Sequence, residues 1–286
     1  MEENLKKKVD RAIKLIQSAS KIAAQNGCPE IEVCYSSGKD SDVILELTKM
    51  AGVPYRAIYR CTTIDPPYTI KHAQDKGVEV ERPKFSFRDV LRKAGIVSRF
   101  RRSCCEYLKE YKILDYAILG IRRDESKKRS DMYKEPELCR IYSKKEKTRQ
   151  YFPILDWTSE DVEEFINVRG IKCHPLYYDK DGKLHAERRL GCLACPMQSQ
   201  KSRLNDFLKY PNLVKMYING GRQFLDTHQH SKIHDTFGNV YEWFCMAIFT
   251  KSMKEFRERF CGENLFGEKI DCKNFLEDYF NIKFKD

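Results

Sequence analysis

A short segment, Ser36-Ser37-Gly38-Lys39-Asp40-Ser41, has the residue types of a phosphate-binding loop. The glycine lets the backbone approach an anion, and the N–H groups at the start of the following helix would face it. The serine hydroxyls can donate further hydrogen bonds, Lys39 adds positive charge, and Asp40 can hold Mg²⁺ or cap the helix. The Walker pattern G-x-x-x-x-G-K-[ST] is absent. A glycine-containing turn that only caps a helix is the alternative interpretation.

Two closely spaced pairs of cysteines form a second group of residues that can do chemistry. Cys192 and Cys195 have the C-x-x-C spacing with which two thiolates bind one metal ion or two corners of a cluster. The adjacent pair Cys104-Cys105 suits a single tetrahedral ion less well, because neighbouring side chains diverge, but it suits the separated iron atoms of a cubane. Four thiolates would complete a [4Fe–4S] cluster. Structural zinc and the absence of any metal are the alternatives.

The loop segment stands where a strand should pass into a helix. Residues 31–35 form a short β-prone run directly before it, and apolar residues at helical spacing follow over 43–47. Further strands are predicted at 54–59, 78–81 and 116–120, and further helices at 4–24, 67–76 and 86–112, the last in two pieces. Strands that alternate with helices indicate an α/β fold with a mostly parallel, Rossmann-like sheet flanked by helices.

Two regions depart from this alternation. Residues 122–150 are crowded with charge and are predicted to form a ligand-facing loop rather than a core element. Beyond residue 200, apolar residues recur at helical spacing over 201–209, 211–226 and 240–260. We therefore predict a nucleotide-binding domain over residues 1–200 and a helical C-terminal region over residues 201–286.

Composition limits the classes of protein to consider. The 286 residues are 41% hydrophobic and 33% charged, which is typical of a globular chain. No apolar run approaches the roughly 18 residues that cross a bilayer, and no apolar signal core follows the N-terminus, so we expect a cytoplasmic protein with no membrane partner. The net charge of +11 favours a nucleotide, a nucleic acid or an acidic protein as partner. Twelve cysteines in such a chain indicate metal binding, catalysis or burial rather than disulfides.

Several segments, taken in order, resemble the phosphoadenosine phosphosulfate (PAPS) reductase family of the adenine nucleotide α-hydrolase, or PP-loop, superfamily. The loop at 36–41 resembles the family's PP-loop. The other matching segments are Thr62-Thr63-Ile64-Asp65-Pro66-Pro67, Arg102-Ser103-Cys104-Cys105, Gly120-Ile121-Arg122-Arg123-Asp124-Glu125-Ser126, Pro153-Ile154-Leu155-Asp156-Trp157-Thr158, His174-Pro175-Leu176-Tyr177 and Gly191-Cys192-Leu193-Ala194-Cys195-Pro196. Together they span residues 30–200, and the paired cysteines resemble the iron–sulfur branch of the family.

The resemblance implies that an adenylyl nucleotide, namely ATP, adenylylsulfate or PAPS, binds at the loop. Its implied phosphate ligands are Ser36, Ser37, Gly38, Lys39, Asp40 and Ser41. Gly120 and Arg122 would lie beside the nucleotide, and Arg129 would offer its guanidinium to a phosphate or sulfate. We also predict that Arg189 faces the nucleotide or tunes the cluster electrostatically.

The resemblance implies sulfur chemistry and leaves the reaction open. A sulfonucleotide reductase of this family takes electrons from a donor such as thioredoxin and attacks with a cysteine in a C-terminal Glu-Cys-Gly-Leu-His motif. That motif is absent, and Phe260-Cys261-Gly262-Glu263 is the nearest segment, so we assign no catalytic residue. One alternative is an ATP-pyrophosphatase-type sulfurtransferase acting on tRNA or DNA, which the positive charge favours. The other is a non-catalytic nucleotide-binding module of a larger complex.

Overall fold

The computed structural model describes residues 2–109, 114–141, 147–262 and 270–284. The chain forms two compact units, which we call the sheet unit and the helical unit. The sheet unit comprises Met1–Cys61, Asp65–Arg82 and Tyr111–Gly191, and the helical unit comprises Thr62–Ile64, Pro83–Glu110 and Cys192–Asp286. Residues 83–110 thus pack with the C-terminal residues, whereas the sequence predicts consecutive domains 1–200 and 201–286. The limits of independently folding domains stay a prediction.

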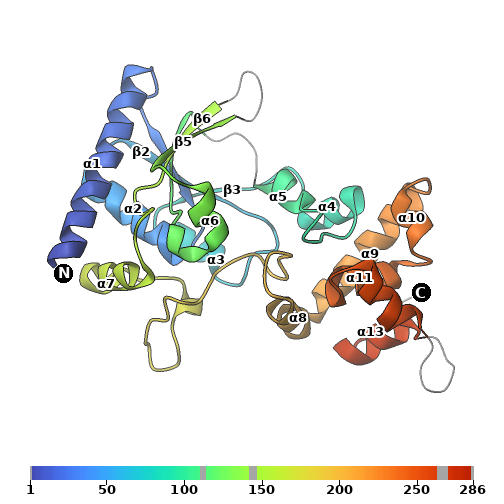
Figure 1. Ribbon diagram of the computed structural model, residues 1–286. Coiled ribbons are helices and arrows are strands. Elements are labelled where there is room, and N and C mark those ends of the chain that lie inside the picture. The colour runs from blue at the N-terminus through green and yellow to red at the C-terminus, as the bar shows by residue number, and fades with distance from the viewer. Residues whose placement is uncertain (1, 110–113, 142–146, 263–269, 285–286) are drawn as a thin grey trace. The chain divides into compact units, whose positions relative to one another are not determined.

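The sheet unit is built on a six-stranded sheet with the strand order β3-β2-β1-β4-β6-β5 (Figure 1). Its strands are β1 (Ile31–Tyr35), β2 (Tyr55–Arg60), β3 (Glu79–Glu81), β4 (Tyr116–Leu119), β5 (Glu137–Ile141) and β6 (Lys147–Tyr151). All neighbouring strands run parallel except β5 and β6, which are antiparallel. The predicted α/β fold with a mostly parallel, Rossmann-like sheet is therefore confirmed.

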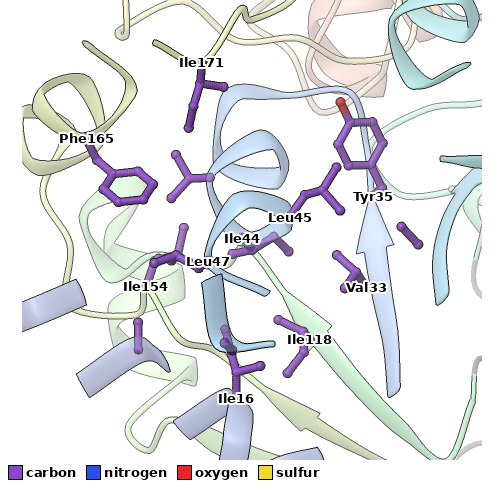
Figure 2. Packing of buried hydrophobic residues seen from close by; sticks show 14 of the residues in the cluster. Ile16, Val33, Tyr35, Ile44, Leu45, Leu47, Ile118, Ile154, Phe165 and Ile171 are labelled. Atoms are coloured by element: carbon purple, nitrogen blue, oxygen red, sulfur yellow. The ribbon is translucent and has the colours of Figure 1, made fainter. Parts of the chain in front are cut away.

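Helices flank this sheet. The helices of the sheet unit are α1 (Glu3–Gln25), α2 (Lys39–Ala51), α3 (Thr69–Asp75), α6 (Lys127–Met132) and α7 (Ser159–Arg169), with the short turns η1 (Arg123–Glu125) and η2 (Pro175–Tyr177). The longer ones, α1, α2 and α7, bury apolar side chains in the core of the unit. Helices α1 and α2 contact each other and the strands β1 and β4. Figure 2 shows Ile16 of α1, Ile44 of α2 and Ile118 of β4 in one apolar layer, and each of these side chains is fully buried. This packing fixes where α2 begins relative to the sheet.

The order of the strands identifies the edge of the sheet where a ligand can bind. Strand β1 lies between β2 and β4, so the chain leaves β1 toward one side and returns to β4 on the other. In open α/β sheets, ligands bind beyond the carboxyl ends of the strands at such a switch point. The segment that follows β1, residues 36–38, and Gly120, which follows β4, both lie there.

The prediction of a loop over residues 122–150 is wrong for much of that region. It contains η1, α6, β5 and β6, and β6 pairs with the interior strand β4. The polar side chains of β6 explain the error, because Thr148 and Gln150 are buried at positions where a sheet core ordinarily carries apolar residues. Residues 142–146 lie outside the described residues.

The helical unit has a core of aromatic side chains. Its helices are α4 (Phe87–Ala94), α5 (Ser103–Leu108), α8 (Gln200–Lys209), α9 (Pro211–Thr227), α10 (Lys232–Thr236), α11 (Val240–Phe249), α12 (Met253–Phe256) and α13 (Cys272–Phe280), and η3 (Arg257–Cys261) is a π-helical turn. Phe207 of α8 makes edge-on contacts with Tyr217, Phe244 and Phe280 from three other helices. The single helix predicted at 240–260 is divided, because α11 ends at Phe249 and Ser252 caps α12.

None of the helices among the described residues combines the length and the apolar character that crossing a membrane requires.

Among the glycines that the structure describes, Gly95, which ends α4, is the one where an added side chain should be tolerated least. Its φ is +76°, and an added Cβ would overlap Cη2 of Trp243 and lie 2.9 Å from Cζ2. We predict that Gly95→Ala lowers the free energy of unfolding by about 2–4 kcal/mol, measured by chemical denaturation. Gly77→Ala is the matched control, because Gly77 has a φ of +73° but no neighbour within 4 Å, and should cost only about 1–2 kcal/mol. Equal losses would contradict the predicted clash.

Candidate functional site

The loop between β1 and α2 is held in shape by its own serine side chains. Ser37 has a left-handed backbone with a φ of 61°, and its buried hydroxyl donates to the carbonyl oxygen of Thr69 at 3.0 Å. The Ser41 hydroxyl donates to the carbonyl oxygen of Gly38 at 2.7 Å, and Ser36 Oγ lies 3.3 Å from Ser41 Oγ. Within the described residues no side chain caps α2, so the N–H groups at its start can meet a bound anion.

A cavity of about 250 Å³ opens at this loop. Most of the residues predicted to contact a nucleotide line it, namely Ser36, Gly38, Lys39, Asp40, Ser41, Gly120, Arg129 and Arg189. The predicted residues Ser37 and Arg122 do not line it. Four further lining residues are outside the predicted set: Cys34, Glu125, Tyr177 and Leu190. Segments that are far apart in the sequence therefore converge on one cavity.

Asp40, in the first turn of α2, is held between two cations. Its carboxylate lies 3.0 Å from Lys39 Nζ and 2.7 Å from Arg122 Nε. Lys39 is only 4% exposed and Arg122 only 2%, so both positive charges are largely removed from water. A buried cation is stable only when it is paired, and Asp40 pairs with both.

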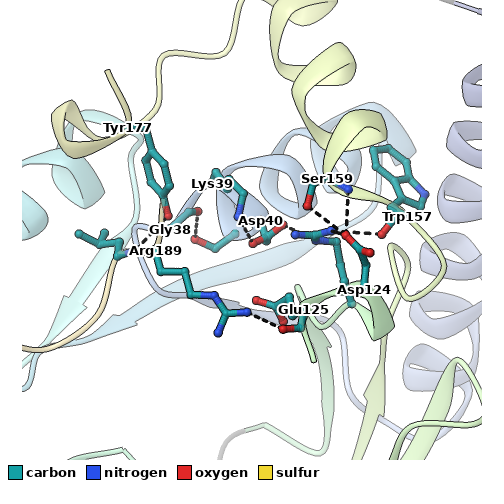
Figure 3. A network of polar contacts seen from close by, with 12 residues as sticks. Gly38, Lys39, Asp40, Asp124, Glu125, Trp157, Ser159, Tyr177 and Arg189 are labelled. Carbon is teal, nitrogen blue, oxygen red and sulfur yellow. Dashed lines mark hydrogen bonds and ion pairs between the residues drawn. The ribbon is translucent and has the colours of Figure 1, made fainter. Parts of the chain in front are cut away.

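Arg122 connects three elements of the sheet unit rather than reaching into the cavity. Besides Asp40, its guanidinium donates to Asp124 Oδ2 and to the carbonyl oxygen of Trp157, each at 3.2 Å. Asp124 in turn accepts hydrogen bonds from the backbone N–H and the hydroxyl of Ser159, at the start of α7 (Figure 3). The side chain that the sequence places beside the nucleotide thus joins the first turn of α2 to α7.

Gly120 allows β4 to approach the first turn of α2 closely. A Cβ atom at this position would lie 2.9 Å from the backbone oxygen of Asp40 and 3.1 Å from its carbonyl carbon. Any larger residue would therefore push the loop and the sheet apart. The glycine is required by this contact, and its φ is not in the left-handed region.

Two arginines bring positive charge to the cavity from other segments. Arg129 of α6 forms an ion pair with Glu125, and Arg189 donates to the Glu125 carbonyl oxygen at 2.5 Å. Burial and the nearby charges of Arg189 and Arg122 lower the pKa of Arg129. An anion bound in the cavity would offset this repulsion, so the arrangement is suited to a phosphate or sulfate.

Tyr177 is a lining residue that the sequence marks only through its His174-Pro175-Leu176-Tyr177 segment. Its hydroxyl accepts from the backbone N–H of Leu190 at 3.3 Å, and the Lys39 ammonium lies 5.8 Å from its ring centroid. An added Cβ on Gly38 would lie 3.4 Å from the same hydroxyl. Figure 3 shows Tyr177 and Arg189 on the side of the loop opposite Trp157. Tyr177 therefore narrows the cavity over the loop.

A second polar cluster, which the sequence does not predict, connects the first turn of α2 to neighbouring segments of the sheet unit. The buried carboxylate of Asp42 accepts a hydrogen bond from the Tyr35 hydroxyl and lies 3.0 Å from His72 Nε2. His72 packs edge-on against His174, whose Nε2 lies 3.1 Å from the carbonyl oxygen of Pro67. Burial lowers the pKa of His174. These contacts join α2 to α3 and to the segment before η2.

All four predicted metal-binding cysteines belong to the helical unit. Cys104 and Cys105 lie in α5, and Cys192 and Cys195 lie in the segment before α8. A hydrogen bond to Cys105 and burial raise the pKa of Cys104, and the charges of Cys195 and Cys192 raise it further. The same hydrogen bond, together with Arg102, lowers the pKa of Cys105 to about 6. The thiol of Cys104 is therefore close enough to the other three for their charges to raise its pKa.

The donor chemistry of these thiols fits an iron–sulfur cluster, whose iron atoms cysteine thiolates hold. Burial raises the pKa of Cys195, and a positively charged metal centre would counteract that effect. Among the described residues, no three side chains of His, Cys, Asp or Glu lie together as they would around one metal ion. The four cysteines are thus gathered in one unit without the tight spacing of a single-ion site.

Replacing Arg122 should destabilise the sheet unit strongly, because its bonds to Asp40, Asp124 and Trp157 are lost together. We predict that Arg122→Met lowers the free energy of unfolding by about 2–4 kcal/mol in urea denaturation. Arg56→Met is the control, because Arg56 and its partner Glu79 are 48% and 50% exposed, and this variant should leave the free energy of unfolding nearly unchanged. Similar losses for the two variants would refute the importance of the buried pair.

Comparison with known proteins places this geometry in context. An uncharacterized protein of Methanocaldococcus jannaschii is 29% identical over 245 residues, which cover 78% of this chain and 57% of that protein. Sulfate adenylyltransferase subunit 2 of Shewanella frigidimarina is 26% identical over 205 residues, which cover 57% of this chain and 64% of that subunit. The chain thus spans less than two thirds of the length of these relatives.

A solved U34-tRNA thiolase from Methanococcus maripaludis, with its [4Fe-4S] cluster, is similar over 79% of this chain and 80% of its own, at 13% identity. The TM-score is 0.33, a likeness too low to bear on fold or function. A family model, by contrast, matches the sequence itself. Residues 30–198, more than half of the chain, match the phosphoadenosine phosphosulfate reductase domain, and the protein therefore belongs to the PAPS reductase domain family.

Proposed function

We propose that this protein binds an adenylyl nucleotide, namely ATP, adenylylsulfate or PAPS, in the cavity at the loop after β1 and uses it in sulfur chemistry. The observation that supports this most directly is the convergence of Lys39, Arg129 and Arg189 on the uncapped end of α2. Membership in the PAPS reductase domain family agrees with it. Cations and a helix N-terminus around one cavity are the groups that bind phosphate.

The size of the cavity suggests which part of the nucleotide it holds. Its volume of about 250 Å³ lies just below the roughly 300–1,000 Å³ of pockets that enclose a whole small ligand. We therefore assign the phosphate or phosphosulfate part to this cavity, where the serine hydroxyls and the cations gather. A Mg²⁺ ion arriving with ATP would compete with Lys39 and Arg122 for the Asp40 carboxylate.

A [4Fe–4S] cluster in the helical unit is the second part of the proposal. Cys104, Cys105, Cys192 and Cys195 would hold it, and structural zinc is the alternative occupant. When bound, the cluster would supply electrons or present sulfur. The chain's own contribution is to bring two distant cysteine pairs into one unit, and the lowered pKa of Cys105 favours the thiolate that a metal requires.

Sulfonucleotide reduction with a donor such as thioredoxin is one form of the reaction. It needs a thiolate nucleophile, and the Glu-Cys-Gly-Leu-His motif that would supply one is absent. Cys261, in the nearest segment, is exposed at the end of η3. Its flanking residues differ from the motif, so we assign it no role.

ATP-dependent sulfur transfer to tRNA or DNA is the second candidate, and a surface feature of the helical unit favours it. Phe100 is 87% exposed and stands between arginines in the segment Arg99-Phe100-Arg101-Arg102, directly before α5. Exposed aromatic rings among cations suit a single-stranded nucleic acid, because bases stack on the ring and phosphates pair with the charges. The net charge of +11 agrees with this partner.

Product analysis distinguishes these reactions. Anaerobically prepared protein is incubated with adenylylsulfate, with PAPS, and with ATP in the presence or absence of nucleic acid. Release of sulfite from a sulfonucleotide supports reduction. Conversion of ATP to AMP and pyrophosphate only when nucleic acid is present supports sulfur transfer. Binding of nucleotide without turnover supports a non-catalytic module of a larger complex.

Lys39→Met should weaken nucleotide binding, because it removes a buried ammonium from the cavity. A charge-assisted hydrogen bond contributes about 1.5–3 kcal/mol, so we predict a dissociation constant about 10- to 100-fold higher by isothermal titration calorimetry. Lys49→Met, at the exposed C-terminal end of the same helix, is the matched control and should bind as the wild type does. Equal affinity of the Lys39 and Lys49 variants would exclude this cavity as the phosphate site.

The cysteine site has its own test. Protein purified without oxygen should contain about four iron atoms and about four acid-labile sulfides per chain. Cys195→Ser should lose most of both, because the cluster then lacks one thiolate. Cys139→Ser, at an exposed position of β5, should retain them. If the wild-type protein contained zinc and no acid-labile sulfide, the site would be a structural zinc site and not a cluster site.

A further inference from the structure

The turn between Cys192 and Cys195 contains a residue in an unfavourable conformation. Leu193 and Ala194 are the central residues of this turn, and Ala194 has a φ of 49°. Position three of a turn with positive φ is ordinarily glycine or asparagine, because a Cβ crowds the backbone there. An alanine left to itself would avoid this conformation by a factor of roughly 5 to 30. Something outside the turn must therefore hold Ala194 in place.

Two side chains of α8 hold both backbone polar groups of Ala194. The N–H of Ala194 donates to Asp206 Oδ2 at 2.8 Å, and its carbonyl oxygen accepts from Arg203 Nε at 3.0 Å. Arg203 and Asp206 are three residues apart, so they lie on the same face of the helix. One face of α8 thus binds the peptide groups that precede and follow the Cα atom of Ala194.

Arg203 also anchors this contact to the core of the helical unit. It is only 5% exposed, and its other two nitrogens donate to the carbonyl oxygens of Ala247 at 3.0 Å and Val97 at 2.9 Å. The planar guanidinium fixes the directions of all three hydrogen bonds at once. The turn cannot move relative to α11 or to the segment after α4 without breaking one of them.

Contacts on either side show that the turn itself, rather than Ala194 alone, is held. The N–H of Leu193 donates to the carbonyl oxygen of Ile64 at 2.9 Å. After the turn, the N–H of Gln198 donates to the carbonyl oxygen of Cys195 at 3.0 Å, and Arg99 Nε donates to that of Pro196 at 3.3 Å. The Ala194 methyl group is fully buried, so the side chain is packed as well.

We propose that Arg203 and Asp206 are positioning residues that impose the left-handed conformation on Ala194 and thereby set the direction of Cys192 relative to Cys195 as metal ligands. The ligand part of this inference rests on the proposed four-cysteine site. A change of sign in φ at Ala194 would redirect the chain between the two cysteines, so one thiol would leave the ligand set even though the rest of the unit stayed folded.

The test uses the full-length protein and five variants. Asp206→Ala removes the acceptor, Asp206→Asn keeps an acceptor oxygen, and Ala194→Gly removes the conformational penalty. The fourth variant combines Asp206→Ala with Ala194→Gly. The fifth, Asp226→Ala on the exposed part of α9, is the matched control for loss of a helical aspartate in the same unit. The circular dichroism spectrum and the melting temperature of each variant are compared with those of the wild type, to confirm that the variant is folded.

Two measurements are made on each protein. The first is hydrogen exchange at the Leu193 amide in the metal-free protein, because its partner, the Ile64 carbonyl, is the same in every variant. The second is the rate at which iron is lost to a chelator from the anaerobically loaded protein. For Asp206→Ala we expect both rates to rise about tenfold, a value within the 5- to 30-fold preference that alanine has against this conformation.

The other variants decide whether the cause is the conformation of Ala194. Asp206→Asn and Asp226→Ala should stay within about twofold of the wild type. Adding Ala194→Gly to Asp206→Ala should recover most of the wild-type behaviour, because glycine adopts a positive φ without a penalty. The inference would be overturned if Asp206→Ala equalled the wild type in both rates. It would also be overturned if adding Ala194→Gly did not lower the raised exchange and iron-loss rates of Asp206→Ala.

Failure of the proposed cysteine site would be visible separately. If the wild-type protein binds no iron, the ligand part of the inference fails with that site. The exchange measurement on the metal-free protein then still decides whether the Asp206 contact imposes the conformation of Ala194.

Discussion

The buried contact between Arg122 and Asp40 is the interaction on which the nucleotide end of the sheet unit depends. Arg122 is 2% exposed and needs a carboxylate, and the carboxylate nearest to it stands in the first turn of α2. Because the same guanidinium donates to the Trp157 carbonyl oxygen, the start of α2 and the segment before α7 are located by one side chain. Gly120 completes the contact, since only a residue without a Cβ lets β4 come so near to Asp40. The shape of the cavity follows from these contacts rather than from the loop sequence alone.

The two segments to which we assign chemistry each contain a residue with the same unusual backbone conformation. Ser37 in the loop and Ala194 between two cysteines both have a positive φ without being glycine. Each is held by hydrogen bonds to residues outside its own turn, Ser37 by Thr69 and Ala194 by Arg203 and Asp206. Strained residues persist only where the surrounding structure determines their conformation, and they concentrate at functional sites. This conformation is compatible with the sites that we propose at both segments.

The two units offer groups of different charge to the proposed functions, namely cations in the sheet unit and ionisable thiols in the helical unit. The sheet unit offers a cavity in which cations outnumber their acidic partners, and binding of an anion would relieve the repulsion that lowers the pKa of Arg129. The helical unit offers four thiols, and the hydrogen bond with Cys104 together with Arg102 lowers the pKa of Cys105 to about 6, which favours its thiolate. Nucleotide binding and sulfur chemistry in the PAPS reductase domain family would use both features.

The sequence by itself determined the mostly parallel sheet, because apolar strands alternating with amphipathic helices have few other ways to bury their surfaces. It also identified the loop at residues 36–41 and the two cysteine pairs, since residue type and short spacing carry that information locally. It did not identify β6, whose side chains are mostly polar, or β5, whose apolar residues do not alternate with polar ones. It also did not identify the role of Arg122, whose partner is 82 residues away. Only the tertiary structure placed residues 83–110 with the C-terminal helices, which brings Cys104 and Cys105 into the same unit as Cys192 and Cys195. The physical reason is that contacts between distant segments depend on packing and burial in three dimensions, which no short stretch of the sequence determines.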